Sequence, residues 1–550
     1  MKQTRINYFF WILSAIFTAG YFYIVYQFSV NIPMDDDLPS LQNFLVRFVQ
    51  ADDIREKVSL LLENGNGHRL LFMRSIVLFV YMVCGKLNYS ICIFIVNLLL
   101  FGTGVLLYKM IRNKNMNGLW VFLTVLLLFN GQNLGNSIVA QFGLTNIGSI
   151  FITFLSIYLL LLNHRPAFIG GLLLSLTAIY SNGNGMLMIP PVIACFCIQK
   201  RTKDMICFGI ISITAAIFYF YGLDTSRLGG DIWSHLPELA ANFFIFIGCN
   251  LWIPSVKFVS LFTGIVCSAI YVWGIFNKVY ERNLFCYACL TFLFITAIAV
   301  AAGNEPVLGG ESTAPWRYRI YGSLFLILTA FLLINNAKAF RVKKLIYLLP
   351  VLALFFCILS TAYCYRKGER RLELKKVSAY RWIHEGKRLG TRYPQAEPEL
   401  IFYLKETEQM GLYTMPRYTL AEYKSAVYCR DENKQFLPDG ILYAVEAVKE
   451  KEEFLLVEGW AYLQSETMRM ESEDIYLYLV NEEKQLVCRP YFERRFDIID
   501  DTGKADCGFF AVIDKTEIPH GTYRLEIGLK SRLKLKRPVF CVSTGRVFNL

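Results

Sequence analysis

The chain has 550 residues, of which 55% are hydrophobic and 18% are charged, and its formal net charge is +12. Soluble domains usually carry about 25% charged residues, so this composition argues against a purely soluble protein. The surplus of Lys and Arg does not indicate a nucleic-acid partner, because no basic and aromatic patch is organised on a soluble module. Long apolar runs fill residues 7–365, and a charged, strand-like sequence follows Arg366, which predicts two regions of different solvent exposure.

The apolar runs predict an α-helical, polytopic membrane domain over residues 1–365, since a bilayer core needs about 20 mostly apolar residues per helix. We expect roughly 11 to 13 transmembrane helices. The clearer runs are residues 8–28, 90–110, 147–163, 167–181, 205–221, 257–277, 283–302, 318–336 and 345–363. The weaker runs are residues 70–85, 119–130, 186–198 and 240–253. The first run has a basic start but no small-residue cleavage site, which indicates a retained anchor.

Loops rich in Lys and Arg set the expected orientation, because cytoplasmic loops carry the excess of these residues. Such loops lie at Lys109, Arg165, Lys200, Lys278 and Lys343. All of them face the cytoplasm if residues 240–253 dip into the membrane without crossing. The loops at 131–146, 181–185, 222–256 and 303–317 then lie outside, together with the C-terminal region. The number of crossings before Lys109 stays open, because an interfacial or half-inserted helix at 70–85 and an exception to the charge rule fit equally.

The first external loop begins with three adjacent carboxylates, Asp35, Asp36 and Asp37, directly after the first apolar run. Such carboxylates repel one another unless a cation or a metal lies among them. They are either solvated loop residues or functional acids at the mouth of a membrane cavity. A divalent cation held by Asp35 and Asp36 is one option for the cofactor, and a metal-free site is the other.

The same loop ends with Glu63, His68 and Arg69, and Arg74 follows inside the next apolar run. Arginines at this position grip a phosphate or extend towards lipid headgroups. A charge placed deep in an apolar run, as at Arg74, more often serves function.

Polar islands interrupt later apolar runs on the same expected face. Gln141 and Asn146 belong to the island at 131–146, and Asn182 belongs to the Ser-Asn-Gly-Asn-Gly segment at 181–185. Arg317 and Arg319 open a later apolar run. Amides suit sugar hydroxyls, but they are also typical of turns and helix ends. A cavity open to the outside explains all of these islands together.

These motifs resemble the GT-C superfamily of membrane glycosyltransferases. The resemblance covers about residues 1–365 and is carried by the acidic trio after the first run, Glu63 with His68-Arg69, the Gln141 loop, the Ser-Asn-Gly-Asn-Gly segment and Arg317-Tyr318. In this chain the sequence Asn-Gly-Asn-Gly separates Glu63 from His68.

The resemblance implies sugar transfer from a polyprenyl-phosphate donor to a cell-envelope glycan or lipid acceptor at the outer face of the plasma membrane. The candidate catalytic bases are Asp36 first, Asp35 second and Asp37 third. Asp37 is also a candidate helix or turn cap, because it adjoins Leu38-Pro39. Arg69, Arg74, Arg317 and Arg319 are expected to hold the donor phosphate. The other expected substrate-binding residues are Glu63, His68, Gln141, Asn146 and Asn182.

The C-terminal region is expected outside the membrane, with a helical and mixed linker at 366–436 and a β-sandwich at 437–550. Alternating apolar residues at 455–462, 475–480, 509–512 and 521–527 predict strands. The segments around Trp460, Arg494 and Gly508 resemble jelly-roll modules of envelope glycan enzymes. Trp460 either packs in the core or stacks on a sugar. Cys429, Cys488, Cys507 and Cys541 permit disulfides without fixing their pairing.

Two other classes of function compete with the transferase. A transporter or flippase of lipid-linked glycans needs ionisable residues near the bilayer midplane and often internal repeats. A non-catalytic envelope scaffold that binds glycans would lose nothing if the acidic trio were converted to amides.

Overall fold

The computed structural model of the chain shows two compact units. It describes residues 2–34, 36–65, 67–110, 117–221, 235–251, 257–303, 316–336, 345–386, 389, 394–429, 434–438, 440–463, 473–495, 498, 507–531 and 539–550. The first unit comprises Met1–Val30, Pro39–Gly368 and Met410–Tyr413. The second unit comprises Asn31–Leu38, Glu369–Gln409 and Thr414–Leu550. The expected division at residue 437 therefore falls inside the second unit.

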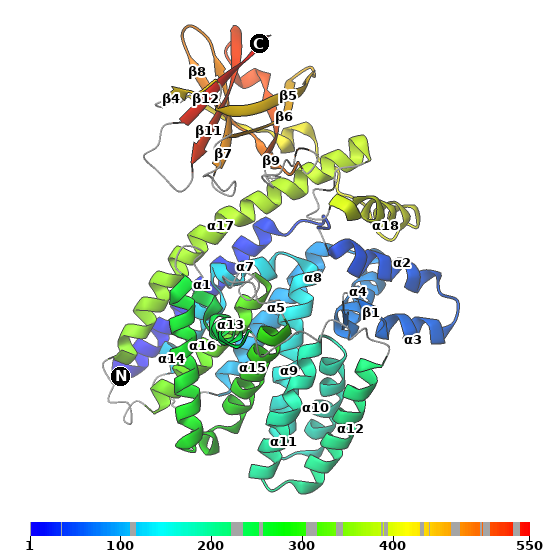
Figure 1. Cartoon of the computed structure of the whole chain (residues 1–550), viewed down its shortest axis with the longest axis vertical. Coiled ribbons are helices and arrows are strands. Elements are labelled where there is room, and N and C mark those ends of the chain that lie inside the picture. Colours follow the sequence, from blue (N-terminus) through cyan, green and yellow to red (C-terminus); the bar gives the residue numbers. More distant parts are fainter. Residues whose placement is uncertain are drawn as a thin grey trace. The chain divides into compact units, whose positions relative to one another are not determined.

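The first unit is built almost entirely from helices (Figure 1). Its longer helices are α1 (Lys2–Phe28), α5 (Tyr89–Tyr108), α9 (Ser149–Leu161), α10 (Arg165–Ile179), α12 (Thr202–Phe220), α14 (Lys257–Phe276), α15 (Leu284–Gly303), α16 (Arg319–Asn335) and the start of α17 (Leu345–Glu385). Its shorter helices are α2 (Asn43–Gln50), α3 (Ile54–Leu62), α4 (Leu71–Cys84), α6 (Asn117–Leu128), α7 (Gly131–Ser137), α8 (Ala140–Gly143), α11 (Ile189–Ile198) and α13 (Leu236–Gly248). A two-residue hairpin, β1 (Asn64–Gly65) with β2 (His68–Arg69), joins α3 to α4.

Several long apolar helices fit a multi-pass membrane protein. Among the described residues, eight helices are long and apolar enough to cross a membrane, and the bent pair α6 and α7 makes up to nine. Four shorter apolar helices cover Leu71–Cys84, Arg165–Ile179, Gly183–Ile198 and Leu236–Leu251. The expected 11 to 13 crossings require these shorter helices to cross as well, and that number stays a prediction.

Helix α12 shows the surface that such a protein presents to lipid. Ile206, Ile210, Ile213 and Ile217 recur at helical spacing and are 52%, 64%, 51% and 67% exposed. A soluble monomer rarely leaves a continuous apolar face of this kind uncovered. The stripe is what a helix facing acyl chains would carry.

Small residues bring α13 and α14 together inside the first unit. A Cβ atom added at Gly248 would lie 1.9 Å from the carbonyl oxygen of Ser260, and one added at Gly264 would lie 1.9 Å from that of Phe244. Close backbone approach at glycine is a common way to pack helices where no hydrophobic effect drives their association.

The second unit carries two sheets (Figure 1). The four-stranded sheet has the order β5-β6-β10-β9, and the six-stranded sheet has the order β3-β8-β7-β11-β12-β4. Neighbouring strands are antiparallel except for β12 and β4. The strands are β3 (Ala426–Cys429), β4 (Lys434–Phe436), β5 (Ile441–Glu450), β6 (Phe454–Leu463), β7 (Glu473–Val480), β8 (Gln485–Arg489), β9 (Tyr491–Glu493), β10 (Gly508–Asp514), β11 (Thr522–Ser531) and β12 (Val539–Asn549).

The sequence correctly predicted strands at the alternating apolar runs. Side chains of both sheets, such as Leu455 and Phe509 from one and Leu477 and Ile527 from the other, share one hydrophobic core. A second core forms where Leu456 and Phe510 meet Val377, Tyr380 and Tyr423, which lie before residue 437. The region at 366–436 is therefore more than a linker, because it supplies part of the packing of the β-rich unit.

Candidate functional site

A broken helix carries the main polar island of the first unit. Helices α6 and α7 bend by 62° at Asn130, whose side chain accepts the N–H of Gln132 and so caps α7. The polar side chains of α7 are buried, with Gln132 3% exposed and Asn133 and Asn136 0% exposed. Broken helices with buried polar residues are tolerated in membrane proteins where they are enclosed by protein or line a cavity.

Hydrogen bonds join this island to the start of α16. Arg319, only 4% exposed, donates to the side-chain oxygen of Gln132. Asn133 Nδ2 lies 3.1 Å from Ser323 Oγ. Asn136 Nδ2 donates to the carbonyls of Trp316 and Arg317 at 3.2 and 3.1 Å. The predicted residue Arg319 is therefore enclosed by the protein.

The segment at 181–185 makes hydrogen bonds to Thr145 and to α16. Asn182 Nδ2 lies 3.4 Å from the carbonyl oxygen of Thr145, and Asn184 Nδ2 donates to Tyr321 Oη at 2.9 Å. The two other predicted amides, Gln141 and Asn146, are 9% and 5% exposed, and Asn146 Nδ2 donates to the carbonyl of Phe142 at 2.9 Å. Thr145 contacts three of the predicted residues, because its hydroxyl bonds to the carbonyl of Gln141 and to Asn146 Nδ2, and its carbonyl accepts from Asn182. Arg319 bonds to Gln132, and a common cavity for the predicted residues stays a prediction.

Arg69 and Arg74 donate to main-chain carbonyls at helix ends. Arg69 donates to Tyr219 and Tyr221 at 3.0 and 2.7 Å, where α12 ends, and also to Leu62 at the end of α3. Arg74 Nη1 donates to the carbonyls of Leu60 and Glu63 at 2.7 Å each. The terminal carbonyls of a helix have no partner inside the helix, so these two arginines stabilise the C-terminal ends of α3 and α12. Phosphate binding by Arg69 and Arg74 stays a prediction. A bound phosphate would compete with these carbonyls for the guanidinium groups.

Glu63 forms a two-point ion pair with Arg47, with N···O distances of 2.7 and 3.0 Å. Both side chains are substantially exposed, at 39% and 46%. An exposed pair of this kind contributes about 0–1 kcal/mol to stability. Glu63 therefore has an ion-pair partner on α2, and its role in substrate binding remains a prediction.

The acidic trio belongs to the second unit where the structure describes it. Asp35 lies outside the described residues, and Asp36 is half-buried. Asp37 is 1% exposed, and its Oδ2 accepts the N–H of Met34 at 3.1 Å, which is the contact expected of a turn cap. Whether the trio faces the polar network of the first unit stays a prediction.

The remaining predicted residues are His68 of β2 and Arg317, which lies just before α16. Desolvation by the surrounding chain and the charge of Arg317 lower the pKa of His68 below its usual 6.5. Both side chains are exposed, and the Arg317 guanidinium lies 5.1 Å from the centre of the Tyr318 ring. A neutral imidazole next to a guanidinium is suited to hydrogen-bond a hydroxyl or a phosphate oxygen.

Among the residues that the structure describes, no group of three or more His, Cys, Asp or Glu side chains is placed to hold a metal ion. A divalent cation at Asp35 and Asp36 stays a prediction, since Asp35 lies outside the described residues. All 15 cysteines are free thiols, so the permitted disulfides among Cys429, Cys488, Cys507 and Cys541 do not form in this structure.

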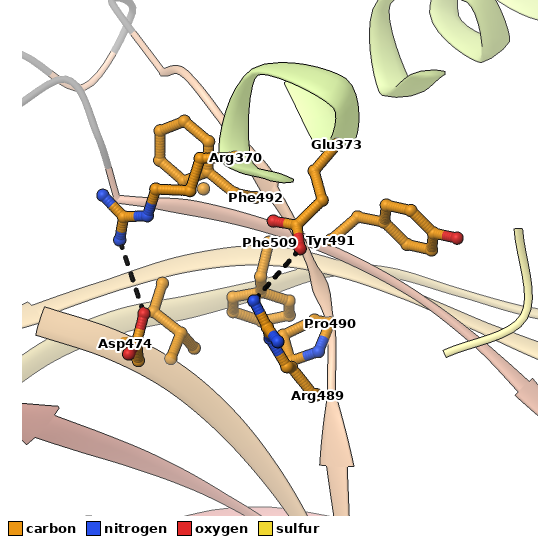
Figure 2. A pocket seen from close by; sticks show the side chains of 10 residues that line it. Arg370, Glu373, Asp474, Arg489, Pro490, Tyr491, Phe492 and Phe509 are labelled. Carbon is orange, nitrogen blue, oxygen red and sulfur yellow. Dashed lines mark hydrogen bonds and ion pairs between the residues drawn. The ribbon is translucent and has the colours of Figure 1, made fainter. Parts of the chain in front are cut away.

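The second unit has a small pocket where α17 meets β7 and β8 (Figure 2). Arg370 and Glu373 of α17 point to Asp474 and Arg489, with ion-pair distances of 3.6 and 3.3 Å. Each guanidinium therefore faces a carboxylate, and the pocket has no uncompensated charge that would attract an ion. We interpret it as a packing interface whose ion pairs hold α17 against the strands.

The C-terminal end of that helix carries an ion cluster that the sequence did not predict. Arg381 is 1% exposed and binds Glu493 through both carboxylate oxygens at 3.0 Å, as well as Glu458 and Glu385 at 2.6 Å. The sequence alone indicated only the pairing of Arg381 with Glu385, which lie four residues apart on one helix.

Trp460 is half-buried and stacks on Tyr462 with ring centres 5.7 Å apart, so sugar stacking by Trp460 stays a prediction.

No family model matches the sequence, and no curated protein matches it. The assignment of a function therefore depends on the residues and their geometry.

Proposed function

We propose that the chain is a membrane glycosyltransferase of the GT-C type. It would move a sugar from a polyprenyl-phosphate donor to a cell-envelope glycan or lipid acceptor on the outer face of the plasma membrane. The observation that carries the proposal is the set of buried polar contacts at the break between α6 and α7, where Gln132 and Asn136 bond to residues at the start of α16 inside an apolar helical body. Membrane proteins bury so many polar groups where they handle a polar substrate.

The proposed chemistry uses an aspartate as the general base. The carboxylate of Asp36, or of Asp35, accepts the proton of the acceptor hydroxyl. The hydroxyl oxygen attacks the anomeric carbon, the bond from that carbon to the phosphate oxygen breaks, and the polyprenyl phosphate leaves with the electron pair. An arginine stabilises the charge that develops on the leaving phosphate. Asp37, as a turn cap, would position the other two.

The C-terminal unit is proposed to be an extracytoplasmic β-sandwich of the jelly-roll type. The core that both sheets share supports a sandwich. Its position outside the membrane follows from the Lys and Arg distribution of the loops. A unit on that side would be available to guide a glycan acceptor.

The deciding experiment measures transfer of radiolabelled sugar from a lipid-linked donor in membranes that contain the variant protein. Asp36→Asn preserves size and hydrogen bonding but removes the proton acceptor, so we expect transfer to fall about 10²–10⁴-fold. Asp52→Asn, an exposed aspartate on the same loop, is the matched control and should keep full transfer. If the Asn variants of Asp35, Asp36 and Asp37 each keep near-full transfer at normal protein level, the mechanism is wrong and a non-catalytic scaffold becomes the better explanation.

The broken helix also favours a second candidate, a transporter or flippase of lipid-linked glycans. Such proteins place substrate sites at discontinuous helices. Proteoliposomes with a fluorescent lipid-linked glycan and no acceptor distinguish the two. A flippase moves the intact lipid across the bilayer, whereas a transferase leaves it in place and releases polyprenyl phosphate only when an acceptor is added.

A further inference from the structure

Helix α3 carries apolar side chains on two different sides. Leu60 is 5% exposed and is buried within the first unit. Ile54 and Val58 are 70% and 48% exposed, and the half-buried Leu61 continues their row, because residues three and four apart share one face of a helix. Packing within the first unit therefore accounts for Leu60 and leaves a second apolar face of α3 uncovered.

The remaining side of α3 is polar. Arg55, Glu56 and Ser59 are exposed and lie away from the row of Ile54 and Val58 on the helix. The helix thus has one side on the protein, one polar side and one apolar side that the chain leaves open. These are the three surroundings that a helix meets at the edge of a protein in a membrane surface.

Hydrogen bonds place the end of α3 at the level where a long apolar helix ends. Arg69 donates to the carbonyl of Leu62, the last residue of α3, and to that of Tyr221, directly after α12. Helix α12 is long and apolar enough to cross a membrane, and α3 runs across its direction (Figure 1). Tyr221 is 80% exposed, and exposed tyrosines are enriched at the level of the lipid headgroups. The end of α3 therefore lies at the membrane surface that α12 reaches.

The apolar surface of the first unit continues to the same level. Ile217, in the exposed row on α12, is 67% exposed and lies about one turn before Tyr221. Phe218 and Phe220 are 62% and 45% exposed. A bilayer that surrounds α12 therefore also reaches the end of α3, so no further partner is needed to cover its second apolar face.

We propose that α3 is an interfacial helix whose Ile54, Val58 and Leu61 enter the boundary between lipid headgroups and acyl chains. Such helices lie in the membrane plane with the apolar face about 5–10 Å inside that boundary. The leaflet is the one at the C-terminal end of α12, which is the outer leaflet in the proposed orientation. Residues 52–57 hold three acidic and two basic side chains, so the contact depends on the apolar face and not on the charge of the lipid. The inference goes beyond the proposed function, since it requires a membrane but no sugar transfer.

A bimane label at Val58→Cys in the full-length protein, reconstituted in phosphatidylcholine vesicles, tests this contact. The exposed native thiols Cys84, Cys197 and Cys429 are first changed to serine. Ser59→Cys, on the polar side of the same helix, is the matched control. We expect the ratio of quenching by a lipid nitroxide near the headgroup to quenching by aqueous iodide to be several-fold larger at Val58 than at Ser59. Replacing half of the lipid with phosphatidylglycerol should leave both ratios unchanged.

Ile54→Cys should behave as Val58→Cys does, because the two positions are one turn apart on the same row. Iodide quenching at Val58 as strong as at Ser59 would place α3 in water and overturn the proposal. Protection of Val58 from both quenchers would show that protein, such as a second copy of the chain, covers this face. Lipid quenching that is equal at the two positions, or strongest from a nitroxide at the acyl-chain end, would place α3 inside the bilayer. A contact seen only with phosphatidylglycerol would make charge its cause. Each of the last three results also overturns the proposal.

Discussion

At the scale of single residues, Arg381 shows how one buried cation can organise the second unit. Its guanidinium, 1% exposed, contacts carboxylates from its own helix and from two strands. Removing one partner of a buried ion pair leaves the others desolvated without compensation, at a cost of about 3–5 kcal/mol. We expect Arg381→Met to lower the free energy of unfolding of this unit by about that amount, measured by hydrogen exchange at β6 and β10 in the full-length protein.

Arg489→Gln is the control for that experiment. Arg489 also pairs with a glutamate of α17, but its side chain is 45% exposed. Solvent reaches Arg489 and screens this pair, so this variant should lose clearly less protection than Arg381→Met. Equal protection in both variants would show that the buried cluster adds nothing beyond a surface pair.

Glu373 gives the second unit a pH dependence of a definite sign. Burial raises the pKa of Glu373 above 4.5, although Arg489 and the N–H of Phe492 act in the opposite direction. The folded state therefore holds this proton at a pH where the unfolded chain has released it. The contribution is fully present below pH 4.5 and is lost as the pH rises through the folded-state pKa.

Glu373→Gln removes this titration, so we expect the variant to lose less stability than the wild type between pH 4 and pH 7. Melting of the second unit at both pH values is the measurement. Glu450→Gln, at an exposed position on β5, controls for the change in net charge. A pH difference unchanged in Glu373→Gln would contradict the assignment.

At the scale of elements, the sequence was most informative where apolar residues recurred with a single periodicity. The alternation in 455–462 and 475–480 predicted β6 and β7, because each strand buries one face in the shared core. The 41-residue α17 was divided at residue 365 instead, since its composition changes there while the helix continues. Local composition reports the solvent around a helix, and it does not report whether the backbone hydrogen bonds continue.

The candidate site was predictable only in part for a similar reason. Asn182, Asn146 and Arg319 stood out because polar residues are rare in apolar runs, and the structure gives each of them a hydrogen-bond partner within the first unit. Tyr321 gave no signal, because a tyrosine in an apolar helix is ordinary. Its contact with Asn184 is a tertiary fact that no spacing along the chain reveals.

At the scale of elements, we predict which fragment of the chain contains the whole stable β-rich unit. A fragment of residues 437–550 lacks β3 and β4 of the six-stranded sheet and leaves Glu458 and Glu493 without Arg381. We expect a fragment of residues 369–550 to be more stable by at least about 3 kcal/mol, because buried carboxylates without their partner are costly. Urea unfolding followed by circular dichroism compares the two, and equal midpoints would show that α17 and the first two strands are dispensable.

At the scale of the whole molecule, the proposed function requires a particular orientation of both units in the membrane. The proposed transfer needs the polar network of the first unit to open outward and the β-rich unit to lie on the same side of the membrane. The charge distribution supports this orientation: the loops at Lys200 and Lys343 would be cytoplasmic, and residues 366–550 would be external. Lys343 itself lies outside the described residues.

Cysteine labelling of intact cells with a membrane-impermeant maleimide tests this orientation. The exposed native thiols Cys84, Cys197 and Cys429 are first changed to serine, so that only the introduced cysteine reacts. We expect Glu482→Cys, at the exposed turn between β7 and β8, to be labelled from outside. Lys200→Cys should react only after the cells are permeabilised, because a loop rich in Lys and Arg is retained in the cytoplasm. The reverse pattern would place the β-rich unit inside the cell, where it could not meet an envelope acceptor, and the proposed function would then fail with the topology.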